Sequence, residues 1–239
     1  MDSKTINTND IKHIAIIMDG NRRWAKLNSK ETFGHDVGAE TLTKIAKYLK
    51  SIGVKYMTVY AFSKENWKRT KEEVSYLMNL FKDYANKIIN KSVEELENVR
   101  VRFIGSDEKL SNELLELIRK VEEKTKNNSD LQLDICFNYS GRQEIVDAAK
   151  KIASGVSNNI IKLDDVNEDT FKNYLYDSEA PYPDLVIRTG GEMRLSNFLL
   201  WQIGYAEFYS TKKYWPEFSE NDINDAIVDF NNRKRNLGK

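Results

Sequence analysis

The chain has 239 residues, 40% of them hydrophobic and 31% charged, a composition typical of one soluble globular domain. Lysine and arginine together number 37, as do aspartate and glutamate, and this zero net charge argues against a general nucleic-acid-binding protein. Cys136 is the only cysteine, so no disulfide can form within the chain and a reducing, cytoplasmic location is expected. No apolar stretch approaches the roughly 20 residues of a membrane-spanning helix, and no signal peptide is expected.

The first predicted strand is the apolar run over residues 13–18. It is short and rich in isoleucine, as in a strand buried on both faces of a parallel sheet. The run ends in an acid, a glycine, an amide and two arginines: Asp19, Gly20, Asn21, Arg22 and Arg23. Gly20 allows a tight turn, and Asn21 or Asp19 is expected to cap the helix that follows. Ordinary surface charges at a strand end are the alternative interpretation.

Strands and helices alternate along the rest of the chain. Further strands are predicted over residues 56–62, 99–103, 131–137 and 184–187. Apolar residues at helical spacing predict helices after Thr70, Ser111 and Ser219, and a helix over residues 42–49 that is ended by Gly53. This order predicts an α/β fold, with one domain over residues 1–239 and a mainly parallel central sheet of about six strands flanked by helices. Residues 1–12 are expected to be a flexible N-terminus.

Three predicted strands end in polar and cationic residues, in the segments 19–23, 63–69 and 188–196. The carboxyl ends of parallel strands share one edge of a sheet, so these side chains are expected to converge there. Arginine binds phosphate oxygens in a bidentate manner, which makes this edge a candidate polyanion site. Asp19 and Glu207 are candidate Mg²⁺ ligands, because Mg²⁺ favours a few carboxylates together with substrate phosphates.

Other common sites lack support in the sequence. The glycine and lysine spacing of a P-loop is absent, and no G-x-G-x-x-G motif opens a strand–helix unit. The only histidines are His13, expected to pack in a strand, and His35, the better site candidate because glycines lie near it. The acidic run 164–168 is expected to supply charge ahead of a short helix rather than to bind a metal. A generic phosphate-binding module remains an alternative.

The sequence closely resembles the cis-prenyltransferases over nearly its whole length. The resemblance rests on blocks that occur in order: residues 13–26, Gly34 and His35, residues 60–69, residues 138–142, and residues 184–202 with Glu207. It implies elongation of an allylic diphosphate, such as farnesyl diphosphate, by isopentenyl diphosphate units with Z double bonds. The expected product is undecaprenyl diphosphate for cell-wall lipid carriers.

The resemblance also implies roles for individual residues. Asp19 and Asn66 match the catalytic positions, with Asp19 handling Mg²⁺, Asn66 accepting a proton, and Glu207 a second metal contact often made from the dimer partner. The residues implied in substrate binding are Gly20, Asn21, Arg22, Arg23, Trp24, His35, Ser63, Lys64, Glu65, Trp67, Arg69, Arg188, Arg194, Leu195 and Ser196. The growing chain is expected in an apolar tunnel beside the helix over residues 74–88 and the strand near Leu131. Plain core packing is the alternative for that apolar helix face.

A homodimer is expected from the resemblance, with no nucleic-acid partner, and peripheral membrane association is left open as a route for product release. Two alternatives stay open: a short-chain or irregular prenyl-coupling enzyme of the same fold, and a non-catalytic dimer partner. Two positions also depart from the family pattern. Glu31 replaces an arginine, which predicts that Lys30 points inward or that allylic affinity is weaker. Arg22 replaces a glycine, adding a cation beside Asp19 that is expected to compensate for Glu31.

Overall fold

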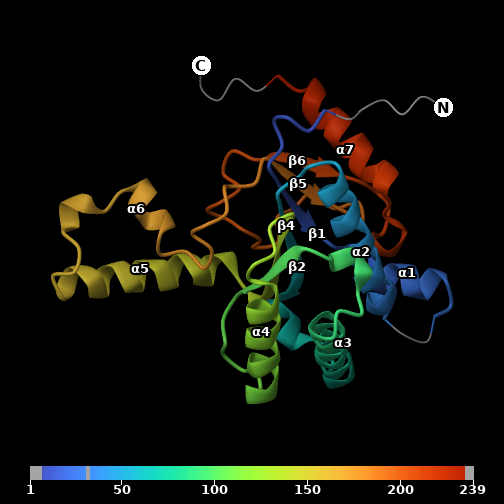
Figure 1. Ribbon diagram of the computed structural model, residues 1–239, viewed down its shortest axis with the longest axis horizontal. Helices are drawn as coiled ribbons and strands as arrows, with labels where there is room; N and C mark the ends of the chain where they lie inside the picture. The colour runs from blue at the N-terminus through green and yellow to red at the C-terminus, as the bar shows by residue number, and fades with distance from the viewer. Residues whose placement is uncertain (1–6, 31–32, 235–239) are drawn as a thin grey trace.

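The computed structural model describes residues 7–30 and 33–234, and its centre is a sheet of six strands (Figure 1). In chain order these are β1 (His13–Ile17), β2 (Tyr56–Ser63), β3 (Val99–Ile104), β4 (Leu131–Tyr139), β5 (Leu185–Arg188) and β6 (Glu207–Ser210). Across the sheet they follow the order β3-β4-β2-β1-β5-β6, and every neighbouring pair is parallel. The predicted α/β fold with a mainly parallel sheet of about six strands is confirmed.

Strand β1 is buried on both faces, as its unbroken apolar sequence predicts. Ile14 belongs to the hydrophobic cluster that contains Leu49 and Ile227 from flanking helices, whereas Ala15 packs in a second cluster with Phe198. On its edges, β1 pairs with β2 on one side and with β5 on the other. The chain order reverses at β1, and the crevice beyond the carboxyl ends of such strands is where open α/β sheets bind ligands.

The helices flank this sheet. They are α1 (Asn21–Leu27), α2 (His35–Ser51), α3 (Lys71–Ile89), α4 (Asn112–Thr125), α5 (Gly141–Ser157), α6 (Glu168–Lys172) and α7 (Glu220–Asn232). Short 3₁₀ turns occupy Lys64–Lys68, Glu94–Leu96, Leu163–Asp165 and Trp215–Glu217. Figure 1 shows α3 and α4 together at the bottom of the view, while α5 and α6 extend to the left, away from the sheet.

Most predicted helix boundaries are confirmed by capping contacts. The Thr70 and Ser111 hydroxyls accept the N–H groups of Glu73 and Leu114, and Gly53 follows α2 with a φ of 86°. The prediction for α1 is wrong, because its N-cap is Gly20, with a φ of 105° and no side-chain cap. A Cβ at Gly20 would lie 2.5 Å from the Tyr214 ring, so both backbone conformation and space require glycine here.

The predicted flexible N-terminus, residues 1–12, lies partly outside the described residues. Within the described part, Ile11 is buried in the core, and the Thr8 hydroxyl donates to the Ile52 carbonyl oxygen at 3.0 Å. The Lys12 N–H donates to the Asp184 carboxylate at 2.7 Å. Thr8, Ile11 and Lys12 therefore contact the fold, and flexibility of the N-terminal residues stays a prediction. None of the described helices is both long and apolar enough to cross a bilayer.

Candidate active site

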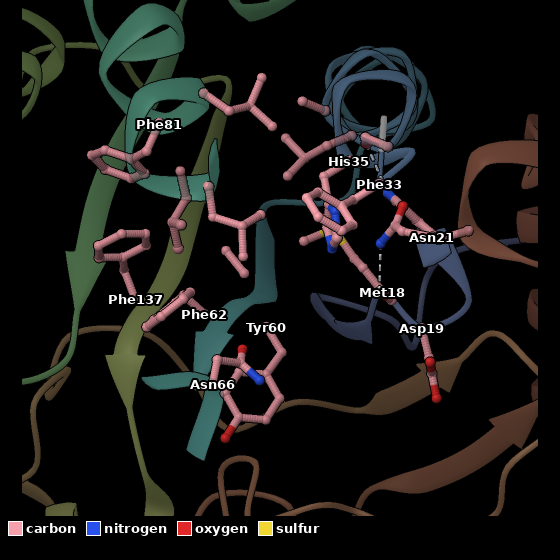
Figure 2. Close-up of a pocket in the computed structure, with 18 of the residues that line it drawn as sticks. Met18, Asp19, Asn21, Phe33, His35, Tyr60, Phe62, Asn66, Phe81 and Phe137 are labelled. Carbon is pink, nitrogen blue, oxygen red and sulfur yellow. Dashed lines mark hydrogen bonds between the residues drawn. The ribbon is translucent and has the colours of Figure 1, made fainter. Parts of the chain in front are cut away.

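A cavity of about 1290 Å³ opens at the carboxyl ends of β1, β2 and β5. One part of its wall is polar and contains several arginines. Figure 2 shows polar side chains such as Asp19 and Asn21 on one side and the aromatic rings of Phe81 and Phe137 on the other. Predicted site residues that line it are Asp19, Gly20, Asn21, Arg22, Arg23, His35, Ser63, Glu65, Asn66, Arg69, Arg188 and Ser196. The strand ends that the sequence predicted to converge thus meet at one cavity.

Arg188 joins the end of β5 to the end of β1. Its side chain is only 4% exposed; Nη2 donates to Asp19 Oδ2 at 2.9 Å and Nη1 to Ser196 Oγ at 2.8 Å. Nη1 also donates to the Arg194 carbonyl oxygen. On the other side of the carboxylate, Arg23 lies 3.1 Å from Asp19 Oδ1. Burial opposes ionisation of Asp19, but the hydrogen bond and charge of Arg188, with Arg23, outweigh it and lower the pKa of Asp19.

A second cationic group lies on the side of the cavity nearer α3. Arg69 donates to the buried Glu73 carboxylate at 2.7 Å, and Arg22 lies 3.6 Å from the other carboxylate oxygen. Burial, reinforced by the charges of Arg69 and Arg22, lowers the pKa of His35 to about 4. His35 is therefore neutral at physiological pH, and its ring presents one donor and one acceptor.

Asn66 lies at the end of β2, in the 3₁₀ turn Lys64–Lys68. Its Oδ1 accepts the Ser63 N–H at 2.9 Å in a capping box, which fixes the orientation of the carboxamide. Figure 2 shows Asn66 and Asp19 on different sides of the cavity; Asn66 comes from the 3₁₀ turn after β2, and Asp19 from the segment after β1. The space between the two side chains is bounded by polar groups from two strand ends.

The apolar part of the wall is aromatic. Phe81 from α3 lies 4.2 Å from Phe137 and 5.1 Å from Phe103, between ring centroids, and Phe62 lies 5.4 Å from Phe137. The side of α3 toward the cavity contributes Leu77, Leu80, Phe81, Tyr84, Ala85 and Ile88. The predicted helix over residues 74–88 therefore does face a cavity, next to β4 residues 133–137 rather than Leu131 itself.

Some predicted substrate-binding residues do not line the cavity. Trp24 packs beside Gly34, where an added Cβ would lie 3.2 Å from the indole ring. Lys64 pairs with Glu108 at 2.8 Å. The Trp67 indole N–H donates to Asn138 Oδ1 at 2.7 Å, so Trp67 holds the turn after β2 against the end of β4. These residues support the walls instead of facing the cavity.

Residues 192–195 and β6 also lie away from the cavity wall. Arg194 is exposed and pairs with Glu192, and Leu195 is 36% exposed. Glu207 on β6 pairs with Arg233 at 2.7 Å. The described residues contain no group of three or more histidine, cysteine, aspartate or glutamate side chains able to hold a metal. The carboxylates on the described wall are Asp19 and Glu65, a number that fits a Mg²⁺ ion held jointly with substrate phosphates.

The two departures from the family pattern have different outcomes. Glu31 lies outside the described residues, but Lys30 does line the cavity, although it is exposed. Arg22 contacts Glu73, and the cations beside Asp19 are Arg23 and Arg188. The expectation that Arg22 adds a charge next to Asp19 is therefore wrong: the first turn of α1 directs Arg22 toward α3.

Two residues that support the site were not predicted from the sequence, Glu73 and Asn197. Glu73 lies in the first turn of α3, and its carboxylate contacts Arg69 and Arg22. Asn197 directly follows Ser196, lines the cavity, and contacts Glu65 and Ser140. The four-residue spacing of Arg69 and Glu73 is a signal that could have indicated their ion pair. The contact of Glu73 with Arg22 and those of Asn197 join segments far apart in the chain, and spacing in the sequence carries no signal for them.

Comparisons with known proteins agree with one another. A family described as "Putative undecaprenyl diphosphate synthase" matches residues 17–238. The isoprenyl transferase of Fusobacterium nucleatum is 51% identical over 230 residues, covering 95% of each chain. The farnesyl-diphosphate-specific ditrans,polycis-undecaprenyl-diphosphate synthase of Micrococcus luteus is 43% identical, covering 98% of this chain and 96% of that protein.

The fold is also that of solved members. The crystal structure of lavandulyl diphosphate synthase from Lavandula x intermedia, in complex with dimethylallyl diphosphate, superposes with a TM-score of 0.91 at 35% identity. The match covers 98% of this chain and all of that one. The chain belongs to the undecaprenyl diphosphate synthase family of cis-prenyltransferases and is a prenyl-transferring enzyme.

Proposed function

We propose that the protein is a Mg²⁺-dependent enzyme that adds isopentenyl diphosphate units to an allylic diphosphate, preferably farnesyl diphosphate. The observation that carries this proposal is a single cavity with a cationic part, containing Arg23, Arg69 and Arg188, and an aromatic apolar part. A prenyl diphosphate has these two chemical characters in one molecule. The name of the Micrococcus luteus relative supports farnesyl diphosphate as the primer.

In the proposed reaction, the C1–O bond of the allylic diphosphate breaks and its electron pair leaves with diphosphate. The isopentenyl double bond attacks C1, a new C–C bond forms, and the proton lost from the isopentenyl unit restores a double bond. Arg22, Arg23 and His35 are proposed to bind the allylic diphosphate, and Arg188 and Ser196 the isopentenyl diphosphate. Fixed donors at these positions stabilise the negative charge that develops on the leaving group.

Asp19 is the proposed metal-binding carboxylate, and Asn66 the proposed group for proton removal. Bound Mg²⁺ supplies further charge neutralisation at the diphosphate. Asp19 suits this role because Arg188 and Arg23 keep it ionised and orient it. Glu207 remains a proposed second contact, for which the Arg233 ion pair would first have to open.

The aromatic part of the cavity is the proposed tunnel for the growing chain. Each added unit brings five carbons, and burial of one CH₂ contributes roughly 0.8 kcal/mol, so the intermediate is held more firmly after each step. The tunnel therefore favours repeated addition and ends it when the cavity is full. We propose undecaprenyl diphosphate for lipid-carrier synthesis as the product.

We further propose a homodimer located in the cytoplasm, with peripheral contact to the membrane when product leaves. Exposed apolar side chains supply candidate contact area, among them Val146 on α5 and Tyr205, which is 89% exposed. Size-exclusion chromatography with light scattering tests the dimer. A monomer at micromolar concentration would contradict it.

A second candidate is irregular coupling of short prenyl diphosphates, favoured by the close superposition with lavandulyl diphosphate synthase. One experiment separates the candidates: incubation with Mg²⁺, isopentenyl diphosphate and labelled farnesyl or dimethylallyl diphosphate, followed by sizing of the products. Elongation of farnesyl diphosphate to long chains that is abolished by EDTA supports the main proposal. Products from dimethylallyl diphosphate alone support irregular coupling, and the absence of any product supports a non-catalytic dimer partner.

A further inference from the structure

We infer that Asn197 is a positioning residue that holds Ser196, and through it Arg188, in place for the isopentenyl diphosphate. This inference rests on the proposed function. Asn197 was not among the predicted site residues, yet it lies on the cavity wall next to Ser196. Its side chain connects the loop after β5 to the ends of two other strands.

The backbone at this point requires support. Ser196 has a φ of 50° and Asn197 a φ of 68°, so two consecutive non-glycine residues adopt the left-handed conformation. L-residues other than glycine rarely adopt it, although asparagine tolerates it better than most. Such conformations persist where surrounding contacts fix them, so the contacts of Asn197 are expected to hold this backbone in place.

The Asn197 carboxamide forms three hydrogen bonds, two in which its Nδ2 is the donor and one in which its Oδ1 is the acceptor. Nδ2 donates to Ser140 Oγ at 2.8 Å and to Glu65 Oε1 at 3.1 Å, and Oδ1 accepts the Arg142 N–H at 2.9 Å. Glu65 follows β2 and Ser140 follows β4, while Asn197 itself follows β5. One side chain therefore joins three strand ends around the cavity.

The backbone of Asn197 completes the attachment. Its carbonyl oxygen accepts the Gly141 N–H at 2.9 Å, and a Cβ at Gly141 would lie 2.9 Å from the same oxygen. The close approach of the two backbones thus depends on glycine at position 141. Together these contacts fix Asn197 against the first turn of α5.

The position of Ser196 matters because its hydroxyl accepts from Arg188 Nη1 at 2.8 Å, and Arg188 also binds Asp19. Without the Asn197 contacts, the loop is expected no longer to hold the Ser196 hydroxyl within hydrogen-bond distance of the Arg188 guanidinium group. The effect should fall on the isopentenyl diphosphate, which is proposed to bind at Arg188 and Ser196. The allylic diphosphate, proposed to bind near Arg22 and His35, should be affected far less.

The test is a double-mutant cycle between Asn197 and Glu65. In Asn197→Asp the left-handed backbone remains accessible, but the donor to Glu65 is lost and two carboxylates face each other. We expect the KM for isopentenyl diphosphate to rise at least tenfold and the KM for farnesyl diphosphate to change less than twofold. In a Glu65→Gln background, where glutamine can donate to the new aspartate, the same substitution should cost less than threefold.

Asn159→Asp is the matched control, because Asn159 is an exposed asparagine with a φ of 54°. It should leave both KM values and the melting temperature unchanged. Asn197→Gly separates the effect of the left-handed backbone from that of the side-chain hydrogen bonds, because glycine keeps the backbone conformation but has no side chain. This variant should raise the KM for isopentenyl diphosphate as Asn197→Asp does.

Calorimetric titration of isopentenyl diphosphate into each variant gives a readout that does not need turnover. A wild-type protein that binds this ligand but does not elongate would refute the proposed function, and weaker binding by Asn197→Asp would still support the positioning role. Equal affinity in wild type, Asn197→Asp and Asn197→Gly would overturn it. The positioning role would also be overturned by a loss of affinity that is equal for both substrates and is the same in the Glu65→Gln background.

Discussion

Replacement of Arg188 by lysine tests the centre of the cationic site. The guanidinium group binds Asp19, Ser196 and the Arg194 carbonyl oxygen at once, and it is almost completely buried. Lysine keeps the positive charge but concentrates it on one nitrogen, so it cannot reproduce the planar fork. The substitution therefore removes geometry while it retains charge.

The size of the effect follows from the bonds that are lost. We expect the lysine to keep the ionic contact with Asp19, because charge-assisted hydrogen bonds are the stronger ones. The bonds to Ser196 and to the Arg194 carbonyl oxygen are then lost, at about 0.5–1.5 kcal/mol each. If both serve substrate binding in the transition state, kcat/KM for isopentenyl diphosphate falls roughly 5- to 150-fold, at 1.36 kcal/mol per factor of ten.

The assay is steady-state elongation of farnesyl diphosphate at saturating Mg²⁺, with the melting temperature measured in parallel. Arg100→Lys is the matched control, because Arg100 lies on β3 and pairs with Glu179 at 3.2 Å, away from the cavity. It should leave kcat/KM unchanged. A loss of less than threefold in Arg188→Lys would refute the reasoning that the fork geometry, rather than the charge, organises this site.

Three further predictions concern stability, product length and pH. Burial, with the charge of Asp177 nearby, raises the pKa of the Asp134 carboxyl group. The folded protein accommodates the protonated carboxyl group and loses stability as pH rises and this buried group must ionise. The Asp134→Asn variant should therefore have a higher melting temperature than the wild type at about pH 8 but not at about pH 4. Thermal melts at both pH values measure this. Phe103→Leu should enlarge the aromatic end of the cavity and lengthen the products by at least one five-carbon unit, seen by chromatography. Because the pKa of His35 is about 4, the KM for farnesyl diphosphate should show no inflection near pH 6.5, and an inflection lost in His35→Gln would contradict this.

The elements of the sheet could be predicted because burial on both faces leaves a strong signal. Strand β1 is apolar after His13, β2 is apolar or aromatic apart from Thr58 until Ser63, and β5 is apolar until Arg188. The order of the strands was not predictable in the same way. Apolar periodicity says which face of a strand is buried, but nothing in it says that β1 lies between β2 and β5.

The site was predictable where one segment carries both the strand and the reactive side chain. Asp19 lies two residues after β1, Arg188 ends β5, and Arg69 follows the 3₁₀ turn after β2. The parallel sheet brings all three to one cavity. Asn197 was not predictable, because its role depends on contacts with Glu65 and Ser140, which lie 132 and 57 residues away. The prediction of a side-chain cap for α1 was wrong for a local reason: the N-cap residue is Gly20, which has no side chain.

The position of Glu73 connects the two parts of the cavity. Its buried carboxylate, in the first turn of α3, holds Arg69 and lies near Arg22. About two and three turns further along the same helix, Phe81 and Tyr84 line the apolar part of the wall. The carboxylate that holds the cations Arg69 and Arg22 and several side chains of the apolar wall thus belong to one helix, so a substitution that shifts α3 is expected to affect both parts of the cavity.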